Sequence, residues 1–258
     1  AQVTVTTATG GTGISADKAL NDGAPTYTTL GNIVITEGLK SDFATTATKI
    51  RINAPTGWKF KAATGTISKT GTNLTLGTTS ITADSIVIPF TISGTNQTDA
   101  ITISGLQVIA SDGANVPNTQ NLYPIITGSI NGLTGTTSLG VISQAVGTRI
   151  KMVVTLPGES FTDGTTLASS GNTGTPTTQT VGVAFNLLKL TVTDQFLNID
   201  TSYKGLKILT FSSSGTSVTV SPTTVNFNAG VSSTTISVSS TVAQTATLTA
   251  SDGTITGP

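Results

Sequence analysis

The sequence of 258 residues predicts an all-β protein that consists of two β-sandwich domains in series. Thr, Ser, Gly and β-branched aliphatic residues dominate it, and these residues favour strands and turns. Short apolar runs are separated by turns rich in Gly, Asn and Asp, at the intervals that are typical of sandwiches. Strong helix formers are sparse and nowhere recur at helical spacing. We therefore expect no helix of ordinary length.

The charge balance excludes two classes of partner. Charged residues make up 9% of the chain, against roughly 25% in an average soluble protein. The 12 basic residues are balanced by 12 acidic ones, and they form no cluster that would bind nucleic acid or an anionic membrane. The apolar runs extend over only a few residues, which is too short for a transmembrane helix. We expect no nucleic-acid partner and no insertion into a membrane.

The chain contains neither histidine nor cysteine. It therefore has no imidazole base, no thiolate nucleophile, no disulfide and none of the commonest zinc ligands. The acidic residues are scattered singly over turns, and nothing in the pattern supports a glycosidase-type carboxylate pair such as Glu37 and Glu159. We expect a protein that is not an enzyme and has no cofactor. The lack of cysteine, together with the Thr/Ser/Gly bias, also favours a bacterial surface protein.

The first half of the chain reads as a series of short strands. Ile50 and Ile52 alternate with Lys49 and Arg51, which directs the isoleucines to the core. Pro89 lies inside an apolar run, where it indicates an edge strand or a bulge. The predicted strands of this half centre on residues 3–6, 33–36, 48–54, 67, 74–76, 86–90, 101–109, 125–130 and 139–142.

Trp58 is the only tryptophan, and it follows the turn at residues 55–57. An exposed tryptophan can stack on a sugar ring, so Trp58 is the candidate ligand-binding residue. The alternative is a core position, because Phe60 shares its strand face and tryptophan is highly buried on average. Burial is the favoured interpretation, and quenching of the Trp58 fluorescence by acrylamide distinguishes the two.

A second domain begins at residues 144–148, which divides the chain into domains of residues 1–146 and 147–258. After a strand at 151–156, residues 158–179 form a loop rich in Gly, Ser and Thr. Loops of this length are often functional, so this loop is the best place for a partner-binding tip. The alternative is that the loop is inert. The remaining predicted strands centre on residues 185–193, 206–212, 217–220, 224–227, 234–238 and 245–250.

The segment 194–198 supplies the turn after the strand that ends at Thr193. We expect Asp194 and Asn198 to hold this corner through hydrogen bonds from their side chains to the local backbone. Asp194, Asn198 and Asp200 are also candidate ligands for Ca²⁺, which prefers oxygen donors. The chain has no Asp-x-Asp-x-Asp-Gly loop, and turn formation explains the same spacing without a metal. The turn is therefore the favoured interpretation.

The second half resembles the immunoglobulin-like repeats of large bacterial surface proteins. The residues that carry this resemblance are Val192–Gly205, with an aspartate, an aromatic residue, an asparagine and then Tyr-x-Gly, followed by Leu209–Phe211 and Thr247–Gly253. The first half is similar to a companion repeat of the same proteins, through residues 33–37 and 93–108 and the Ala-Pro-Thr-Gly-Trp-Lys-Phe segment that ends at Phe60.

This resemblance implies two immunoglobulin-like sandwiches at the surface of a bacterium of the Bacteroidetes type. The function that it implies is that of a structural repeat unit in an adhesin, a stalk or an extracellular fibre. The alternative is a module that binds carbohydrate or another ligand, with surface glycans as partners. Asp84-Ser85-Ile86 resembles the O-glycosylation sites of these bacteria, which makes Ser85 a candidate glycosylation site.

The resemblance also leads us to expect one more strand after the turn at residues 252–253. The segment Ala1–Thr7, AQVTVTT, alternates in the way that such a strand would. We therefore expect residues 1–7 of one unit to complete the second domain of a neighbouring identical unit by strand donation. The alternative is that residues 1–7 pair inside the first domain.

Overall fold

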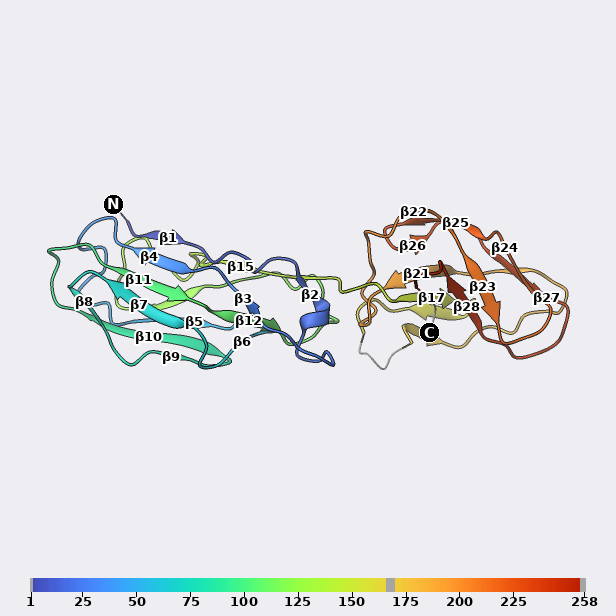
Figure 1. Ribbon diagram of the computed structural model, residues 1–258, viewed down its shortest axis with the longest axis horizontal. Coiled ribbons are helices and arrows are strands. Elements are labelled where there is room, and N and C mark those ends of the chain that lie inside the picture. Colours follow the sequence, from blue (N-terminus) through green and yellow to red (C-terminus); the bar gives the residue numbers. More distant parts are fainter. Residues whose placement is uncertain (1, 166–169, 256–258) are drawn as a thin grey trace. The chain divides into compact units, whose positions relative to one another are not determined.

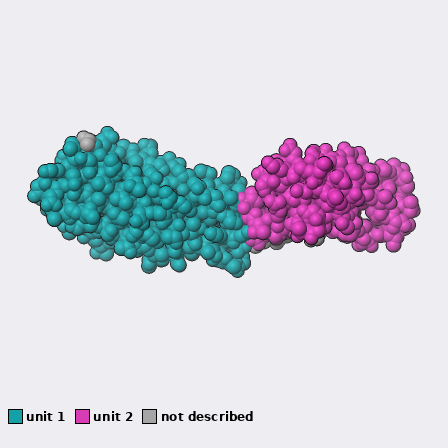
Figure 2. Space-filling view, turned by 45° about the horizontal axis from the view of Figure 1, so that its top comes forward, with its two compact units in different colours: residues 1–145 teal, residues 146–258 magenta. Residues whose placement is uncertain are grey.

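The computed structural model describes residues 2–165 and 170–255. Within these residues the protein is all-β, and the one helical segment is a 3-10 turn, η1, at Ala16–Lys18 (Figure 1). The chain divides into two compact units, unit 1 of residues 1–145 and unit 2 of residues 146–258 (Figure 2). The all-β class predicted from the sequence is confirmed.

Unit 1 is built on two larger antiparallel sheets and three small ones (Figure 1). The first larger sheet has the order β1(Thr4–Thr6)-β4(Ile33–Thr36)-β11(Ala100–Ser104)-β7(Thr66–Thr70). The second has the order β14(Pro124–Thr127)-β5(Lys49–Asn53)-β10(Ser85–Ile92)-β8(Leu74–Leu76), and β9(Ser80–Ile81) also pairs with β10. The small sheets are β3(Thr28–Thr29)-β12(Gln107–Ala110)-β6(Trp58–Phe60), β13(Gln120–Asn121)-β15(Val141–Ile142) and the parallel pair β16(Gln144–Ala145)-β2(Ile14–Ser15).

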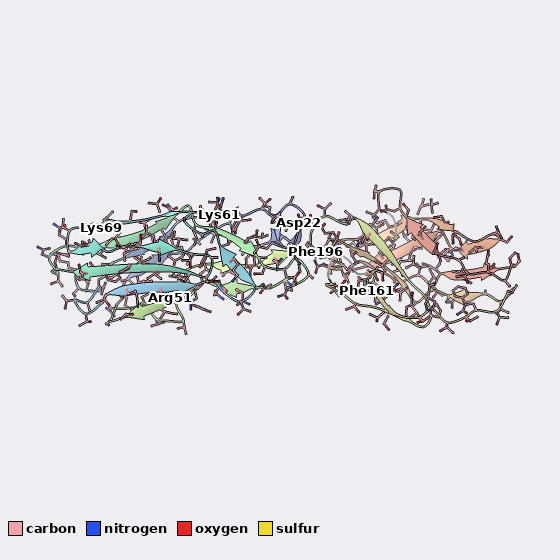
Figure 3. All side chains as sticks on the ribbon, turned by 90° about the horizontal axis from the view of Figure 1, so that it is seen from below. Asp22, Arg51, Lys61, Lys69, Phe161 and Phe196 are labelled. Carbon is pink, nitrogen blue, oxygen red and sulfur yellow. The ribbon has the colours of Figure 1, made fainter. Side chains whose placement is uncertain are left out.

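Strand alternation builds the core of unit 1. Ile33 and Ile35 of β4, and Ile50 and Ile52 of β5, are at most 1% exposed. Arg51, labelled in Figure 3, is exposed between the two isoleucines of β5, as the alternation predicts. Full burial of each such aliphatic side chain contributes roughly 1.5–3 kcal/mol to folding.

Pro89 was predicted to lie in an edge strand or at a bulge, and the edge strand is wrong because β10 is a central strand. β10 pairs with β5 through its residues 85–89, and on its other side with β9 and then β8. On that side, β10 pairs with β9 up to Val87 and with β8 from Phe90 onward. Pro89 therefore lies in the gap between the two ladders. The Phe90 N–H points to the β5 side, where it donates to Thr48 O (2.9 Å). Successive N–H groups of a strand point to opposite sides, so an N–H at position 89 would point into the gap. The ladder therefore loses no hydrogen bond to the proline.

The N-terminal strand pairs inside unit 1, and the predicted exchange of residues 1–7 is therefore wrong for the part that the structure describes. β1 runs antiparallel to β4, with Val5 opposite Ile35. Val3 is buried in its own unit, and its N–H donates to Asn131 O (3.0 Å). Burial in the same unit avoids the loss of translational and rotational freedom that exchange between molecules would cost. Ala1 lies outside the described residues.

Unit 2 is also made of antiparallel sheets. Its largest sheet has the order β17(Lys151–Thr155)-β21(Lys189–Thr193)-β26(Val231–Ser232)-β25(Thr224–Asn228)-β22(Gly205–Ile208). The others are β20(Phe185–Asn186)-β27(Ser237–Ser240)-β24(Val218–Ser221), β23(Thr210–Ser213)-β28(Leu248–Ser251) and β18(Glu159–Phe161)-β19(Asn172–Gly174). The core contains Met152, Leu190, Val192, Tyr203, Val225, Phe227, Ile236 and Ala250, all buried.

The segment 158–179 contains a hairpin and is not an irregular loop throughout. β18 and β19 pair within it, and Asn172 of β19 anchors the hairpin by donating to Val154 O (2.8 Å) and accepting from Thr155 Oγ1 (3.0 Å). Phe161 of β18, labelled in Figure 3, lies under the Lys189 ammonium at 5.4 Å. Residues 166–169 of the predicted binding tip lie outside the described residues.

Candidate functional site

Asp194 is the centre of the corner that follows β21. Its side chain is fully buried, and its Oδ1 accepts hydrogen bonds from the N–H groups of Phe196 (2.9 Å) and Asn198 (3.0 Å). Its Oδ2 accepts from Asn198 Nδ2 (2.8 Å) and from Gly147 N (2.8 Å). The predicted corner is confirmed for Asp194, whose carboxylate binds the local backbone, whereas the Asn198 side chain donates to that carboxylate. Burial raises the pKa of Asp194, and these hydrogen bonds oppose that rise.

The left-handed residue of this corner is Leu197, with φ 64°, and not one of the Asx residues. A branched side chain in that conformation costs roughly 1–2 kcal/mol. Leu197 is fully buried, so its packing offsets this cost. Gly230 completes the corner, because a Cβ added to it would lie 2.7 Å from Asp200 O.

Asp200 forms a second cluster with a residue that sequence reasoning missed. Its Oδ2 pairs with Arg149 Nε (2.8 Å), and its Oδ1 accepts from the N–H (2.9 Å) and hydroxyl (2.6 Å) of Ser202. The Arg149 guanidinium also lies 5.3 Å from the centre of the Tyr203 ring. Arg149 also donates to Ser202 Oγ (3.1 Å), and no sequence motif points to these partners.

The candidate calcium ligands are engaged in protein contacts. Both oxygens of Asp194 and both oxygens of Asp200 have protein partners, and Asn198 donates its amide to Asp194. Among the described residues no group of three or more acidic side chains is placed to hold a metal ion. The arrangement supports the turn interpretation and gives Ca²⁺ no free carboxylate at this corner.

Tyr203 and Asp252 connect the two motifs that carry the resemblance. The Tyr203 hydroxyl donates to Asp252 Oδ2 (2.7 Å), and its ring packs edge-to-face on Phe227 at 4.9 Å. Burial raises the pKa of Tyr203 well above its usual range, and the bond to Asp252 acts in the same direction. Burial alone would raise the pKa of Asp252. Hydrogen bonds from Thr254, Ile255 and Tyr203 outweigh it and hold that pKa well below its usual range.

Asp252→Asn is expected to flatten the acid sensitivity of unit 2. Since the pKa of Asp252 is lower in the folded than in the unfolded chain, its contribution is present above about pH 4 and is lost as the pH falls toward the lowered value. The variant loses roughly 1–2 kcal/mol at pH 7 and less at low pH. Urea unfolding of unit 2 between pH 7 and pH 2.5 measures this. An equal loss of stability at every pH would contradict the prediction. The control is Asp84→Asn, at an exposed site of unit 1.

Trp58 is a core residue, which agrees with the favoured interpretation and removes it as the candidate ligand-binding residue. It is 2% exposed, and its Nε1 donates to Asn118 O (3.2 Å). Phe60 on the same strand is 1% exposed. Tryptophan buries more apolar surface than any other side chain, so a unit with few aromatic residues gains most by placing it inside. The burial alternative is therefore the one that the structure supports.

Ser85 and the two glutamates also have structural positions. Ser85 begins the central strand β10 and is only 7% exposed, so a glycan on it conflicts with the folded unit. Glu37 is buried, and its two oxygens accept from the N–H groups of Phe43 (2.7 Å) and Asp99 (2.8 Å). Glu159 belongs to unit 2, where it accepts from Leu156 N (2.8 Å). Each glutamate ties two segments of its own unit together.

The surface is hollowed in both units. One lies in unit 2, has a volume of about 420 Å³ and is lined mainly by the segment 176–183 and by residues 242–248, with Val181 and Val183 largely exposed. The other lies in unit 1 beside the edge strand β14, has a volume of about 550 Å³ and includes Tyr123. Residues 176–179 of the unit 2 hollow belong to the segment 158–179, which was the predicted place for a partner-binding tip, whereas sequence reasoning assigned no role to the hollow of unit 1.

Comparison with protein-family models, with curated proteins and with solved structures gives no match to this chain. In the part of the chain that the structure describes, no helix is long and apolar enough to cross a bilayer.

Proposed function

We propose that this chain is a non-catalytic structural repeat unit of a bacterial cell-surface adhesin, stalk or extracellular fibre. Its chemistry supports this role, because the buried carboxylates of the corner and of Glu37 hold backbone groups together. The low charge and the Thr/Ser-rich strands suit an extracellular, hydrated element. The observation that carries the proposal is the way in which the first and last segments of unit 1 are joined.

These two segments run parallel and exchange backbone hydrogen bonds. Ala8 N donates to Leu139 O (2.8 Å), Ser143 N to Gly11 O (2.9 Å) and Ile14 N to Ser143 O (2.8 Å). β2 and β16 then pair in parallel, with Ile14 opposite Gln144. Gly11 permits this close approach, because a Cβ there would lie 2.6 Å from Val141 O. We name residues 8–15 and 139–145 the terminal clamp.

Parallel pairing decides how the terminal clamp bears load. β1 lies away from the end of unit 1 that carries β2, and Ala145 lies beside β2, opposite Ser15 (Figure 1). Tension between the two ends therefore pulls the paired segments past each other along their length. All the hydrogen bonds of the clamp are loaded together, so the unit resists force as a repeat in a tensioned fibre must. Forced unfolding is governed by the unfolding barrier, which this geometry raises.

The partners that this function implies are neighbouring repeats or subunits of the same kind. Strand β22 ends the largest sheet of unit 2 and pairs on one side only within the described residues. β22 carries Leu206 and Ile208, which are 71% and 78% exposed. An exposed apolar edge strand favours addition of a strand from a neighbour. This surface supports lateral or serial contact between units.

Single-molecule pulling tests the proposed load-bearing role. Because the chain has no cysteine, two introduced cysteines define the pulling direction. Handles at Gln2→Cys and Thr148→Cys shear the terminal clamp, whereas handles at Lys18→Cys and Thr148→Cys peel its bonds one after another. We expect a several-fold higher unfolding force in shear, and we expect Ser143→Pro, which removes one clamp N–H, to lower only the shear force. Equal forces in the two directions would remove the observation on which the proposal rests.

A further inference from the structure

The lining of the hollow in unit 1 includes an exposed aromatic ring, that of Tyr123. Tyr123 and Ile125 are 43% and 51% exposed, and they alternate with the buried Leu122 and Pro124. Alternation at the edge strand β14 therefore directs a tyrosine ring and an isoleucine outward into the hollow. The other two tyrosines lie against cationic or aromatic side chains, and Tyr123 has no such contact among the described residues.

Three amide side chains line the same hollow, and each is held on one side by an intramolecular hydrogen bond. Asn53 Oδ1 accepts from Arg51 Nε (2.8 Å), and Asn121 Oδ1 accepts from Ser138 Oγ (2.8 Å). Gln120 Nε2 donates to Asn118 Oδ1 (3.2 Å).

The bonds that hold the amides leave their other ends available. The Nδ2 groups of Asn53 and Asn121 remain as two donors, and Oε1 of Gln120 remains as one acceptor, with no partner within the described part of the chain. The hollow therefore presents oriented donors and an acceptor beside an apolar ring. A hydroxyl group both donates and accepts, so neighbouring hydroxyls of one ligand match this set.

The charge of the lining restricts the ligand further. None of the described residues that line the hollow is charged, and the neighbouring Arg51 guanidinium is hydrogen-bonded to Asn53 Oδ1, so the lining itself favours a neutral ligand over an anion or an amine. Its volume of about 550 Å³ lies in the range of small-molecule sites, roughly 300–1,000 Å³. A neutral molecule with one apolar face and a rim of hydroxyl groups fits all of these features.

We propose that the hollow beside β14 binds a neutral saccharide, with the apolar face of a pyranose ring on Tyr123 and its hydroxyl groups on Asn53, Gln120 and Asn121. The ring contact uses the electron-rich face of the tyrosine against sugar C–H groups. The amides select hydroxyl-bearing ligands over purely apolar ones, because they are oriented before the ligand binds. The proposed site does not include Trp58, which is buried in the core of the same unit.

Titration calorimetry with lactose, cellobiose and maltose, each added to the full chain, tests the site. We expect saturable binding of at least one of these sugars, with a dissociation constant in the millimolar range, since the hollow is open. Tyr123→Ala is expected to weaken that binding at least about tenfold, and Tyr123→Phe to keep it within about threefold.

The matched control is Tyr27→Ala, which removes another tyrosine ring of unit 1, in contact with Lys61. It is expected to leave the affinity unchanged. The absence of saturable binding by all three sugars would overturn the proposal. So would binding that Tyr123→Ala does not weaken, or that Tyr27→Ala weakens equally. Because Tyr123 is exposed, circular dichroism of Tyr123→Ala should match that of the parent chain, which separates loss of the site from loss of the fold.

Discussion

Asp194→Ala is expected to destabilise unit 2 by about 3–5 kcal/mol. The fully buried carboxylate accepts four hydrogen bonds, and its removal leaves the N–H groups of Phe196 and Asn198 buried without an acceptor. It also releases Gly147, which precedes the first strand of the unit. Urea unfolding followed by far-ultraviolet circular dichroism measures the loss.

Trp58 fluorescence provides an internal reference for this experiment, because the only tryptophan lies in unit 1. The midpoint of the unfolding transition followed by Trp58 fluorescence should stay the same, whereas the midpoint for unit 2 should move to a lower urea concentration. Asp163→Ala is the matched control: its Oδ1 accepts one exposed bond, from Ile199 N (2.9 Å), and we expect a loss of about 1 kcal/mol or less. A loss for Asp194→Ala no larger than that of the control would contradict the central role of this carboxylate.

Trp58→Ala is expected to destabilise unit 1 by about 3–5 kcal/mol, the cost of a large cavity in a packed core. The side chain is 2% exposed, and its removal also leaves Asn118 O without the indole donor. Trp58→Phe should cost less, since it keeps most of the apolar volume. Thermal unfolding followed by circular dichroism distinguishes the three proteins.

The burial of Trp58 has a second readout in the parent chain. Acrylamide should quench its fluorescence only weakly until unit 1 unfolds. Tyr123→Ala is the comparison for stability, because it removes an exposed aromatic ring of the same unit and should change the free energy of unfolding by less than about 0.5 kcal/mol. Strong quenching of the folded protein, or an equal loss in the two alanine variants, would contradict the core position.

The load-bearing proposal and the saccharide proposal stand on separate observations. The first depends on backbone pairing between residues 8–15 and 139–145, and the second on the side chains beside β14. Failure of sugar binding leaves the shear geometry intact, and equal forces in the two pulling directions leave the hollow intact. A repeat that both bears load and contacts a neutral glycan would serve an adhesin directly.

Local patterns predicted much of the fold. The alternation of Ile50 and Ile52 with charged residues identified a strand and its buried face, and the structure has both. The Asx spacing at Asp194 and Asn198 predicted a corner held by side-chain bonds, and those bonds are present. Both predictions succeeded because strand periodicity and Asx turns depend on residues only a few positions apart.

Other features were predicted wrongly or were missed, because they depend on partners that are distant in the sequence. Pro89 suggested an edge strand, but whether a strand is central depends on which strands flank it. Tyr123 carried no signal, since its exposure follows from the position of β14 at a sheet edge. Arg149 meets Asp200 and Tyr203 across more than fifty positions of the chain.

The sequence by itself determined the all-β class, the turn at Asp194 and the lack of histidine and cysteine chemistry. Only the tertiary structure decided that Thr4–Thr6 pair inside unit 1 and that residues 8–15 and 139–145 run parallel in the terminal clamp. The physical reason is that side-chain periodicity specifies which face of a strand is buried. Which strands become neighbours depends on how whole sheets close around a core.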